Sequence, residues 1–209
     1  MPPNQRLERS LQKNGYKLIA GIDEVGVGSL AGPVVAAAVV LPPLSKIPGL
    51  DDSKKLSAKK RNILFKIILK RSIAIGIGIV DWETIDRLNI LNASHLAMKL
   101  AVDALSPAPQ FLLIDGRYKI ASSFPQVPIC KGESKCSAIA AASIIAKVAR
   151  DRIMENFDQT YPNYGFRAHK GYGTKKHLRT LNKFGACAIH RQSYLPVKRS
   201  LKVHIPLDF

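Results

Sequence analysis

Apolar residues along the chain gather in short runs, several of them rich in β-branched side chains. Each run ends after a few residues at a polar or glycine-rich segment. Short bounded runs of this composition are typical of β-strands. The pattern predicts five strands, at residues 17–23, 33–41, 73–80, 111–115 and 127–130.

Longer stretches between these runs have the spacing of helices. Ser57 is a plausible N-cap for a helix over residues 58–71. Further helices are predicted at residues 82–88, from about 92 to 105, and over the Ala- and Ile-rich residues 134–157. Because strands and helices are interspersed, we expect an α/β fold in which helices flank a mixed sheet.

Composition divides the chain into three parts. Residues 161–209 carry ten Lys or Arg and a single acid, Asp208, so we expect a basic C-terminal helical extension packed on the core. Residues 17–160 form the predicted core, and residues 1–16 form a loose or helical lead-in. The full length of 209 residues suits one domain with a small appendage.

The charge balance indicates an anionic partner. Lys and Arg number 32 against 15 Asp and Glu, which gives a formal net charge of +17. Nucleic acid is the commonest partner that offsets such self-repulsion, and a membrane surface comes second. The longest apolar run, near residues 34–41, is too short to span a bilayer.

The three cysteines, Cys130, Cys136 and Cys187, lack paired CxxC spacing. This odd number argues against a disulfide framework and against a zinc site. The polar N-terminus has no apolar segment of the kind found in secretory signals. We therefore expect a cytoplasmic protein with reduced thiols and no membrane association.

Carboxylates follow two of the predicted strands. Asp23 and Glu24 end the first strand, and Asp115 ends another. Acids at strand ends often start turns or cap helices, but open α/β sheets also bind ligands at this rim. A further acid, Glu133, precedes the long helix, where it could simply favour the helix dipole.

If these four acids cluster, they repel one another unless protons or cations intervene. Hard oxygen ligands select Mg²⁺ or Mn²⁺, and two such ions can activate water and stabilise the leaving oxygen of a phosphodiester. A strongly basic chain with an acidic cluster therefore indicates a polyanion-binding protein with a metal-dependent active site.

A glycine-rich turn after Asp23 fits the loose dinucleotide-binding pattern GxGxx(G/A) over residues 26–31. Two features disfavour that interpretation. The two acids would direct negative charge toward the pyrophosphate. The pattern is also followed by Pro33 and an apparent strand, where that fingerprint requires a helix.

Several motifs, taken in order, resemble type 2 ribonuclease H, and specifically its ribonuclease HII branch. The likeness runs from about residue 17 to residue 200. The segments that carry it are GIDEVGVGSLAGPVVAAAVVL (21–41), DSKKLS (52–57), LIDG (113–116), KGES (131–134), AAASIIAKVARD (140–151), YGFRAHKGYGT (164–174) and HRQSYLPVK (190–198).

This resemblance implies a ribonuclease H-like fold and an endonuclease that cuts the RNA strand of RNA–DNA hybrids 5′ of ribonucleotides. The cut would leave 3′-hydroxyl and 5′-phosphate ends. The resemblance also implies that Asp23, Glu24 and Asp115 hold divalent metal. The family normally has Asp in a Lys-Gly-Asp block at the position of Glu133, so the longer side chain predicts an altered Mg²⁺/Mn²⁺ preference.

A second departure lies in Gly26-Val27-Gly28, where the family usually has Gly-Arg-Gly. That loop approaches the 2′-hydroxyl in the family, and the 2′-hydroxyl distinguishes RNA from DNA. Glycines permit close backbone approach, but Val27 cannot make the arginine's phosphate contacts. We therefore expect retained cleavage of hybrids and weaker incision at a lone ribonucleotide in duplex DNA.

Other substrate contacts implied by the resemblance lie outside this loop. Tyr172 resembles the aromatic residue that stacks near the RNA–DNA junction. Phosphate-contacting roles are expected for Lys54, Ser143, Lys147, Lys170 and Arg191. None of the histidines has a metal-ligand spacing, although His169 is expected near the site because it belongs to the HKGYGT block.

Two alternatives stay open at this point. The ribonuclease HIII branch also lacks the loop arginine, but it usually carries an additional N-terminal domain, and only about sixteen residues precede the first predicted strand here. The second alternative is a protein that binds hybrids but has lost catalysis through the change to Glu133. The retention of all four negative charges argues against this alternative. We expect a monomer.

Overall fold

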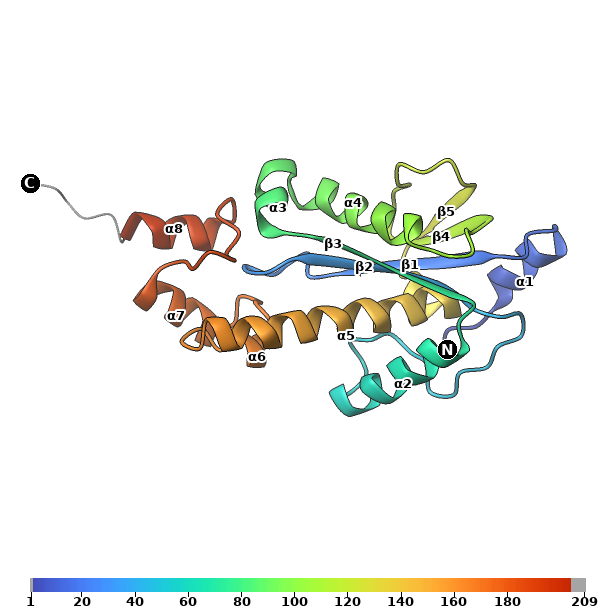
Figure 1. Cartoon of the computed structure of the whole chain (residues 1–209), viewed down its shortest axis with the longest axis horizontal. Helices are drawn as coiled ribbons and strands as arrows, with labels where there is room; N and C mark the ends of the chain where they lie inside the picture. The colour runs from blue at the N-terminus through green and yellow to red at the C-terminus, as the bar shows by residue number, and fades with distance from the viewer. Residues whose placement is uncertain (1, 204–209) are drawn as a thin grey trace, which may run out of the picture.

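The computed structural model describes residues 2–203. A five-stranded mixed sheet lies at its centre, with helices on both faces (Figure 1). The strands lie in the order β3-β2-β1-β4-β5, with antiparallel pairing among the first three and parallel pairing of β1 with β4 and of β4 with β5. Their bounds are β1 Ile19–Val25, β2 Val34–Val40, β3 Ala74–Val80, β4 Phe111–Asp115 and β5 Gln126–Ile129.

The predicted fold class is confirmed, and each predicted strand end lies within two residues of the observed one. The two faces of the sheet are covered by different helices (Figure 1). α2 (Ala58–Arg71) and α5 (Ser137–Thr160) cover one face, and α3 (Trp82–Leu88) and α4 (Ile90–Asp103) cover the other.

Local capping explains where these helices begin. The Ser57 side chain accepts a hydrogen bond from the Lys60 N–H, as predicted. α4 begins at Ile90, two residues earlier than expected, because the Asn89 side chain caps it. The helix predicted from residue 134 begins at Ser137, because Gly132–Ser134 form a separate 3₁₀ turn.

Close packing against α4 explains the glycines of β3. A β-carbon on Gly76 would lie 2.0 Å from the Ala101 carbonyl oxygen, and one on Gly78 would lie 2.0 Å from that of Ala97. Only glycine lets the strand and the helix backbones approach this closely. The alternation of apolar residues with glycine in this strand therefore reflects helix–sheet contact.

The terminal segments both pack on α5. The N-terminal helix α1 (Arg6–Lys13) places the buried Glu8 carboxylate at the start of α5, where it accepts hydrogen bonds from the Cys136 thiol and the Ala138 N–H. The C-terminal helices α6 (Phe166–His169), α7 (Lys175–Phe184) and α8 (Leu195–Val203) lie near the other end of α5 (Figure 1). Asp208, noted above in the extension, lies outside the described residues.

None of the helices in residues 2–203 is long and apolar enough to cross a membrane.

Candidate active site

Strand pairing brings the first three acids to one edge of the sheet. β1 and β4 are adjacent and parallel, and Ile22 pairs with Ile114, so Asp23 and Asp115 come next in register. Side chains alternate between the faces of a strand. Asp23 therefore lies on the α5 face with Ile19, and Glu24 lies on the α4 face with Ile22.

A tight turn before α5 brings the fourth acid to the same place. Asp115 Oδ1 accepts a 2.6 Å hydrogen bond from the Gly132 N–H. Lys131 has a φ of 55°, which turns the chain sharply into the 3₁₀ segment that contains Glu133. The four predicted carboxylates thus form one acidic cluster, which we define as Asp23, Glu24, Asp115 and Glu133.

Burial and mutual repulsion disfavour the ionised form of the carboxylates in this cluster. Burial raises the pKa of Asp23 well above its ordinary value, and the nearby Glu24 and Asp115 raise it further. Burial followed by the charge of Asp115 raises the pKa of Glu24 to about 7. Burial and then the neighbouring Glu133 raise the pKa of Asp115 to about 6. The cluster therefore favours protons or cations over open negative charge.

The carboxylates fit a divalent cation. Buried oxygens of two of them, Glu24 Oε2 and Glu133 Oε2, accept no hydrogen bond from the described residues, and an all-oxygen donor set suits Mg²⁺ or Mn²⁺. Within residues 2–203, no group of three or more His, Cys, Asp or Glu side chains is arranged to hold a metal ion by itself. Mg²⁺ usually keeps several waters and binds through one or two carboxylates together with substrate phosphates, so it does not require three protein ligands.

Four of the predicted substrate-contacting residues lie beside the cluster on the α5 side. A pocket of about 300 Å³ is lined by Glu24 together with Lys54, Ser143, Lys147 and Tyr172. The Ser143 hydroxyl lies 2.8 Å from that of Ser53, which fixes the loop before α2 against α5. Burial lowers the pKa of Lys54, but attraction to Asp23 and the other nearby acids outweighs this and raises it overall, so Lys54 stays charged.

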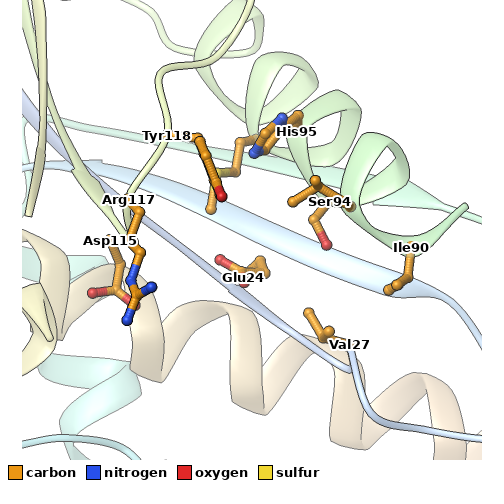
Figure 2. Close-up of a pocket in the computed structure, with 11 residues that line it drawn as sticks. Glu24, Val27, Ile90, Ser94, His95, Asp115, Arg117 and Tyr118 are labelled. Atoms are coloured by element: carbon orange, nitrogen blue, oxygen red, sulfur yellow. The ribbon is translucent and has the colours of Figure 1, made fainter. Parts of the chain in front are cut away.

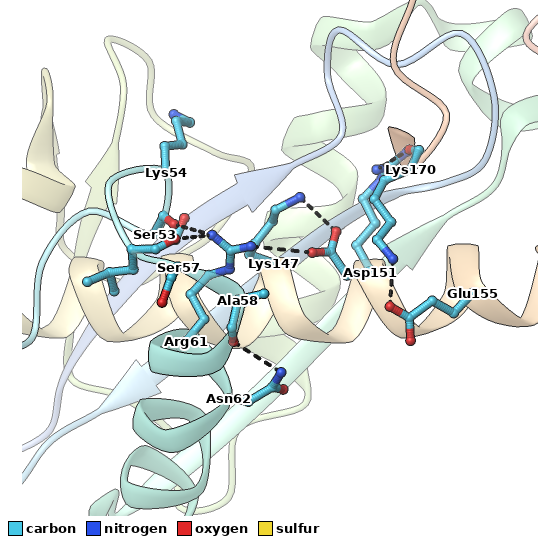
Figure 3. A network of polar contacts seen from close by, with 12 residues as sticks. Ser53, Lys54, Ser57, Ala58, Arg61, Asn62, Lys147, Asp151, Glu155 and Lys170 are labelled. Carbon is cyan, nitrogen blue, oxygen red and sulfur yellow. Dashed lines mark hydrogen bonds and ion pairs between the residues drawn. The ribbon is translucent and has the colours of Figure 1, made fainter. Parts of the chain in front are cut away.

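The lysines of this region form a polar network along α5 (Figure 3). Lys147 forms a 2.7 Å ion pair with Asp151, and its ammonium lies 5.6 Å from the Tyr172 ring centroid. Lys170 pairs instead with Glu155 at 2.6 Å and does not line the pocket that contains Glu24. Lys170 is therefore held at Glu155, outside that pocket, and its phosphate contact stays a prediction.

The phosphate contact predicted for Arg191 does not agree with the structure, because this side chain is fully buried and cannot reach a phosphate. Its guanidinium donates hydrogen bonds to the Gly32 and Val27 carbonyls and to the Tyr194 hydroxyl, at 2.9 to 3.1 Å. The expected phosphate contact is thus replaced by a structural one. Arg191 holds the Gly26-Val27-Gly28 loop from within.

A second buried guanidinium, which sequence reasoning missed, holds the other half of that loop. Arg150 of α5 donates to the carbonyls of Ala31, Pro33 and Lys170 at 2.9 to 3.1 Å. Gly26 has a φ of +96°, and a β-carbon there would lie 2.2 Å from Arg150 Nε, so this position requires glycine. An Arg in the apolar AAASIIAKVARD segment was the only signal for this role.

His169 lies inside the extension and is absent from the pocket beside Glu24. Its ring stacks on His177 at 4.3 Å, and its Nε2 bonds to the Tyr164 carbonyl at 2.9 Å. His177 Nε2 in turn lies 3.0 Å from His190 Nε2, and burial lowers the pKa of both to about 4. These neutral histidines pack the extension together and bring no ligand to the acids.

A second pocket, on the α4 side of the acids, was also missed (Figure 2). Most of its lining comes from α4 and from the segment after β4, which are distant in sequence, and the α4 residues belong to no motif noted above. It contains Glu24, Val27 and Asp115, so it adjoins the acidic cluster directly.

Comparison with known proteins identifies the family. A family model described as Ribonuclease HII matches residues 20–197. The ribonuclease HII of Listeria innocua is 51% identical over 200 residues, covering 96% of this chain and 76% of that protein. The ribonuclease HII of Acetivibrio thermocellus is 54% identical over 187 residues, covering 90% and 73%.

A solved structure supports the fold. The ribonuclease H2 of Pyrococcus horikoshii superposes with a TM-score of 0.76 at 23% identity, covering 88% of this chain and 97% of that one. These matches confirm the resemblance carried by the motifs and favour the ribonuclease HII branch over the ribonuclease HIII branch. The chain belongs to the ribonuclease HII family, enzymes that hydrolyse the RNA strand of RNA–DNA hybrids.

Proposed function

We propose that the acidic cluster is the catalytic centre and that it binds Mg²⁺ or Mn²⁺. The convergence of four carboxylates carries this proposal; Asp23 is buried, the other three are half-buried, and Glu24 and Glu133 each keep one unpartnered buried oxygen. Bound divalent cations supply an activated water and stabilise the leaving oxygen of the phosphodiester. The expected products carry 3′-hydroxyl and 5′-phosphate ends, with cleavage 5′ of ribonucleotides.

Positive and polar groups beside the cluster hold the scissile strand. Lys54 and Lys147 supply charge for backbone phosphates, and Ser143 adds a hydroxyl on the same wall. Tyr172, with Lys147 and Arg150 over its ring at 5.6 and 5.4 Å, presents a fixed aromatic face to a sugar or base. Lys170 contributes only to the general positive field.

Recognition of RNA is assigned to the backbone of the Gly26-Val27-Gly28 loop. Arg191 and the Tyr194 hydroxyl both donate to the Val27 carbonyl, which fixes this peptide whatever its side chain. The Val27 side chain is 39% exposed and carries no charge for a phosphate. We therefore assign efficient cleavage to hybrids and weaker incision to single ribonucleotides in DNA.

Glu133 stands where the family has Asp, and its extra methylene changes the reach of one ligand. Replacing Glu133 with Asp is expected to alter the ratio of Mg²⁺- to Mn²⁺-supported activity. An unchanged ratio would remove this idea. We further assign the reaction to a monomer in the cytoplasm, where free thiols such as those of Cys130, Cys136 and Cys187 stay reduced.

Paired substrates test the proposal directly. The protein is incubated with a labelled RNA–DNA hybrid and with a duplex of equal length that carries one ribonucleotide, in Mg²⁺ and then in Mn²⁺. We expect rapid cleavage of the hybrid and slow incision of the second duplex. Cleavage of the hybrid alone would show that junction recognition is lost, and cleavage of neither would leave only a hybrid-binding protein.

A further inference from the structure

The pocket on the α4 side of the acidic cluster has a volume of about 270 Å³ (Figure 2). Its inner surface is apolar, and a few polar groups interrupt it. The lining beyond Glu24, Val27 and Asp115 consists of Ile90, Leu91, Ser94, His95, Met98, Gly116, Arg117 and Tyr118. A mostly apolar pocket with a few converging polar groups is the usual form of a small-molecule or nucleoside site.

Ser94 gives this pocket a polar group that the protein does not use. The residue is 5% exposed, and among the described residues nothing hydrogen-bonds to its buried hydroxyl. Figure 2 shows this hydroxyl turned toward Glu24 and Val27. Because a buried hydroxyl without a partner is unfavourable, its place here indicates a ligand atom that completes it.

Besides Ser94, the pocket is lined by two aromatic rings, Tyr118 and His95, and by the cationic Arg117. Tyr118 is 59% exposed, and its ring lies edge-on to His95 with centroids 6.1 Å apart. The exposed Arg117 precedes it. Figure 2 shows the Arg117 guanidinium beside Asp115. An exposed aromatic ring can stack on a base, and a cation that lines the same pocket can attract a phosphate.

The position of the pocket relates it to the nucleic acid strand. Glu24 lines both this pocket and the one that contains Lys147 and Tyr172. The two pockets open toward α4 and α5, which cover opposite faces of the sheet. A strand that crosses the carboxylates from Tyr172 is therefore directed toward this second pocket.

We propose that the pocket formed around Ser94, His95, Arg117 and Tyr118 is a second nucleotide subsite of the scissile strand. It takes the sugar and base of the nucleotide across the cut from Tyr172. Tyr118 stacks on the base, the Ser94 hydroxyl bonds to the sugar or base, and Arg117 attracts the adjoining phosphate. The proposal deepens the proposed function and rests on it for the identity of the strand.

Binding to hybrids with single missing bases tests this subsite. Dissociation constants are measured by fluorescence anisotropy in EDTA, for an intact hybrid and for hybrids with one abasic position on either side of the expected cut. We expect one position, on the side away from Tyr172, to weaken binding to the wild-type protein about tenfold. Tyr118→Ala should raise the dissociation constant of the intact hybrid by the same factor. It should cause no further increase for the hybrid that lacks this base, because the stacking partner of Tyr118 is already absent.

Ser94→Ala separates a binding role from a structural one. Removing an unpartnered buried hydroxyl should leave the melting temperature unchanged or raise it, while hybrid binding weakens several-fold. Tyr118→Phe should keep most of the affinity, because the ring is retained. Phe184→Ala, which removes an exposed aromatic residue on α7, should leave binding unchanged.

The subsite would be overturned if the loss of affinity in Tyr118→Ala added to the loss at every abasic position. It would also be overturned if Tyr118→Ala and Ser94→Ala both bound the intact hybrid as tightly as the wild type. Cleavage of the intact hybrid in Mg²⁺ is measured in parallel. Absence of cleavage would contradict the proposed function, whereas the dissociation constants test the subsite independently of catalysis.

Discussion

Two groups of charged side chains lie beside the Gly26–Pro33 segment: the guanidiniums of Arg150 and Arg191, and the carboxylates of the acidic cluster. They differ in how their polar atoms are satisfied. The guanidiniums of Arg150 and Arg191 are completely buried, and they donate hydrogen bonds to five backbone carbonyls and one hydroxyl. The carboxylates of the acidic cluster, in contrast, repel one another and keep oxygens without partners.

The difference separates structural charge from functional charge. Charges that serve the fold are satisfied within the protein, because an unpaired buried charge is costly. The acidic cluster retains that cost, which a bound cation would remove. Perturbed carboxylates in a concave site are a physical indication of function, and the arginines beside them keep the loop in place for it.

The largest expected effect is on catalysis. Asp23→Asn should reduce hybrid cleavage by about a thousandfold or more, because it removes one charge that binds the cation. It should not destabilise the metal-free protein, since it relieves repulsion with Glu24 and Asp115. Cleavage rates and melting temperatures are measured for the same proteins. Asp103→Asn, which changes an exposed acid on α4, is the control. A large loss of stability would assign Asp23 a structural role.

The opposite result is expected for the buried arginines. Arg150→Met should destabilise the protein by about 3 kcal/mol or more, because three buried carbonyls lose their donor. Arg150→Lys should rescue little, since one ammonium cannot match the planar fork. Urea unfolding gives the comparison with Arg167→Ala, whose exposed ion pair with Asp158 should matter little. Equal stabilities would refute the structural assignment.

Cation affinity should depend on pH with a defined sign. The pKa of Glu24 is about 7 and that of Asp115 about 6 in the metal-free protein. Below these values a cation must displace protons, so affinity for Mn²⁺ should fall as pH drops from 8 to 6, by up to about tenfold per pH unit for each proton displaced.

The same groups should act on stability in the metal-free state. Because their folded pKa values are raised, the folded protein holds protons that the unfolded chain has lost, and this contribution to stability declines as pH rises from about 4 to 7. Calorimetric titration at several pH values measures both the affinity and the protons released. Affinity independent of pH would place the cation elsewhere.

The smallest expected effect concerns the loop between the two regions. Val27→Arg should raise incision at a lone ribonucleotide relative to hybrid cleavage by about tenfold, since it restores a phosphate-binding charge. Stability should change little, because the Val27 side chain is 39% exposed and the arginines hold its backbone. Val27→Leu is the control for size. An unchanged cleavage ratio in Val27→Arg would exclude this explanation of junction recognition.

Local pattern predicted the strands and the ends of α2 and α3, and it singled out the four acids as candidates, because strand periodicity and capping are properties of neighbouring residues. It placed Asp23 and Asp115 at the ends of two strands of one sheet, and the pairing of β1 with β4 then brings them together. Arg191 was placed wrongly because an Arg in a basic segment gives no sign of the carbonyls that surround it after folding. Residues of the Ser94 pocket come from distant segments, and only tertiary packing brings them together.

The most direct test of the acidic cluster as a cation site is the melting temperature of wild type and Asp23→Asn at pH 8, with and without Mn²⁺. A cation at about one hundred times its Kd adds about 3 kcal/mol, which should raise the wild-type melting temperature by about 5 to 10 °C. Asp23→Asn should begin at an equal or higher melting temperature and respond weakly. An equal rise in both proteins, or no rise in the wild type, would contradict the assignment of these carboxylates to cation binding.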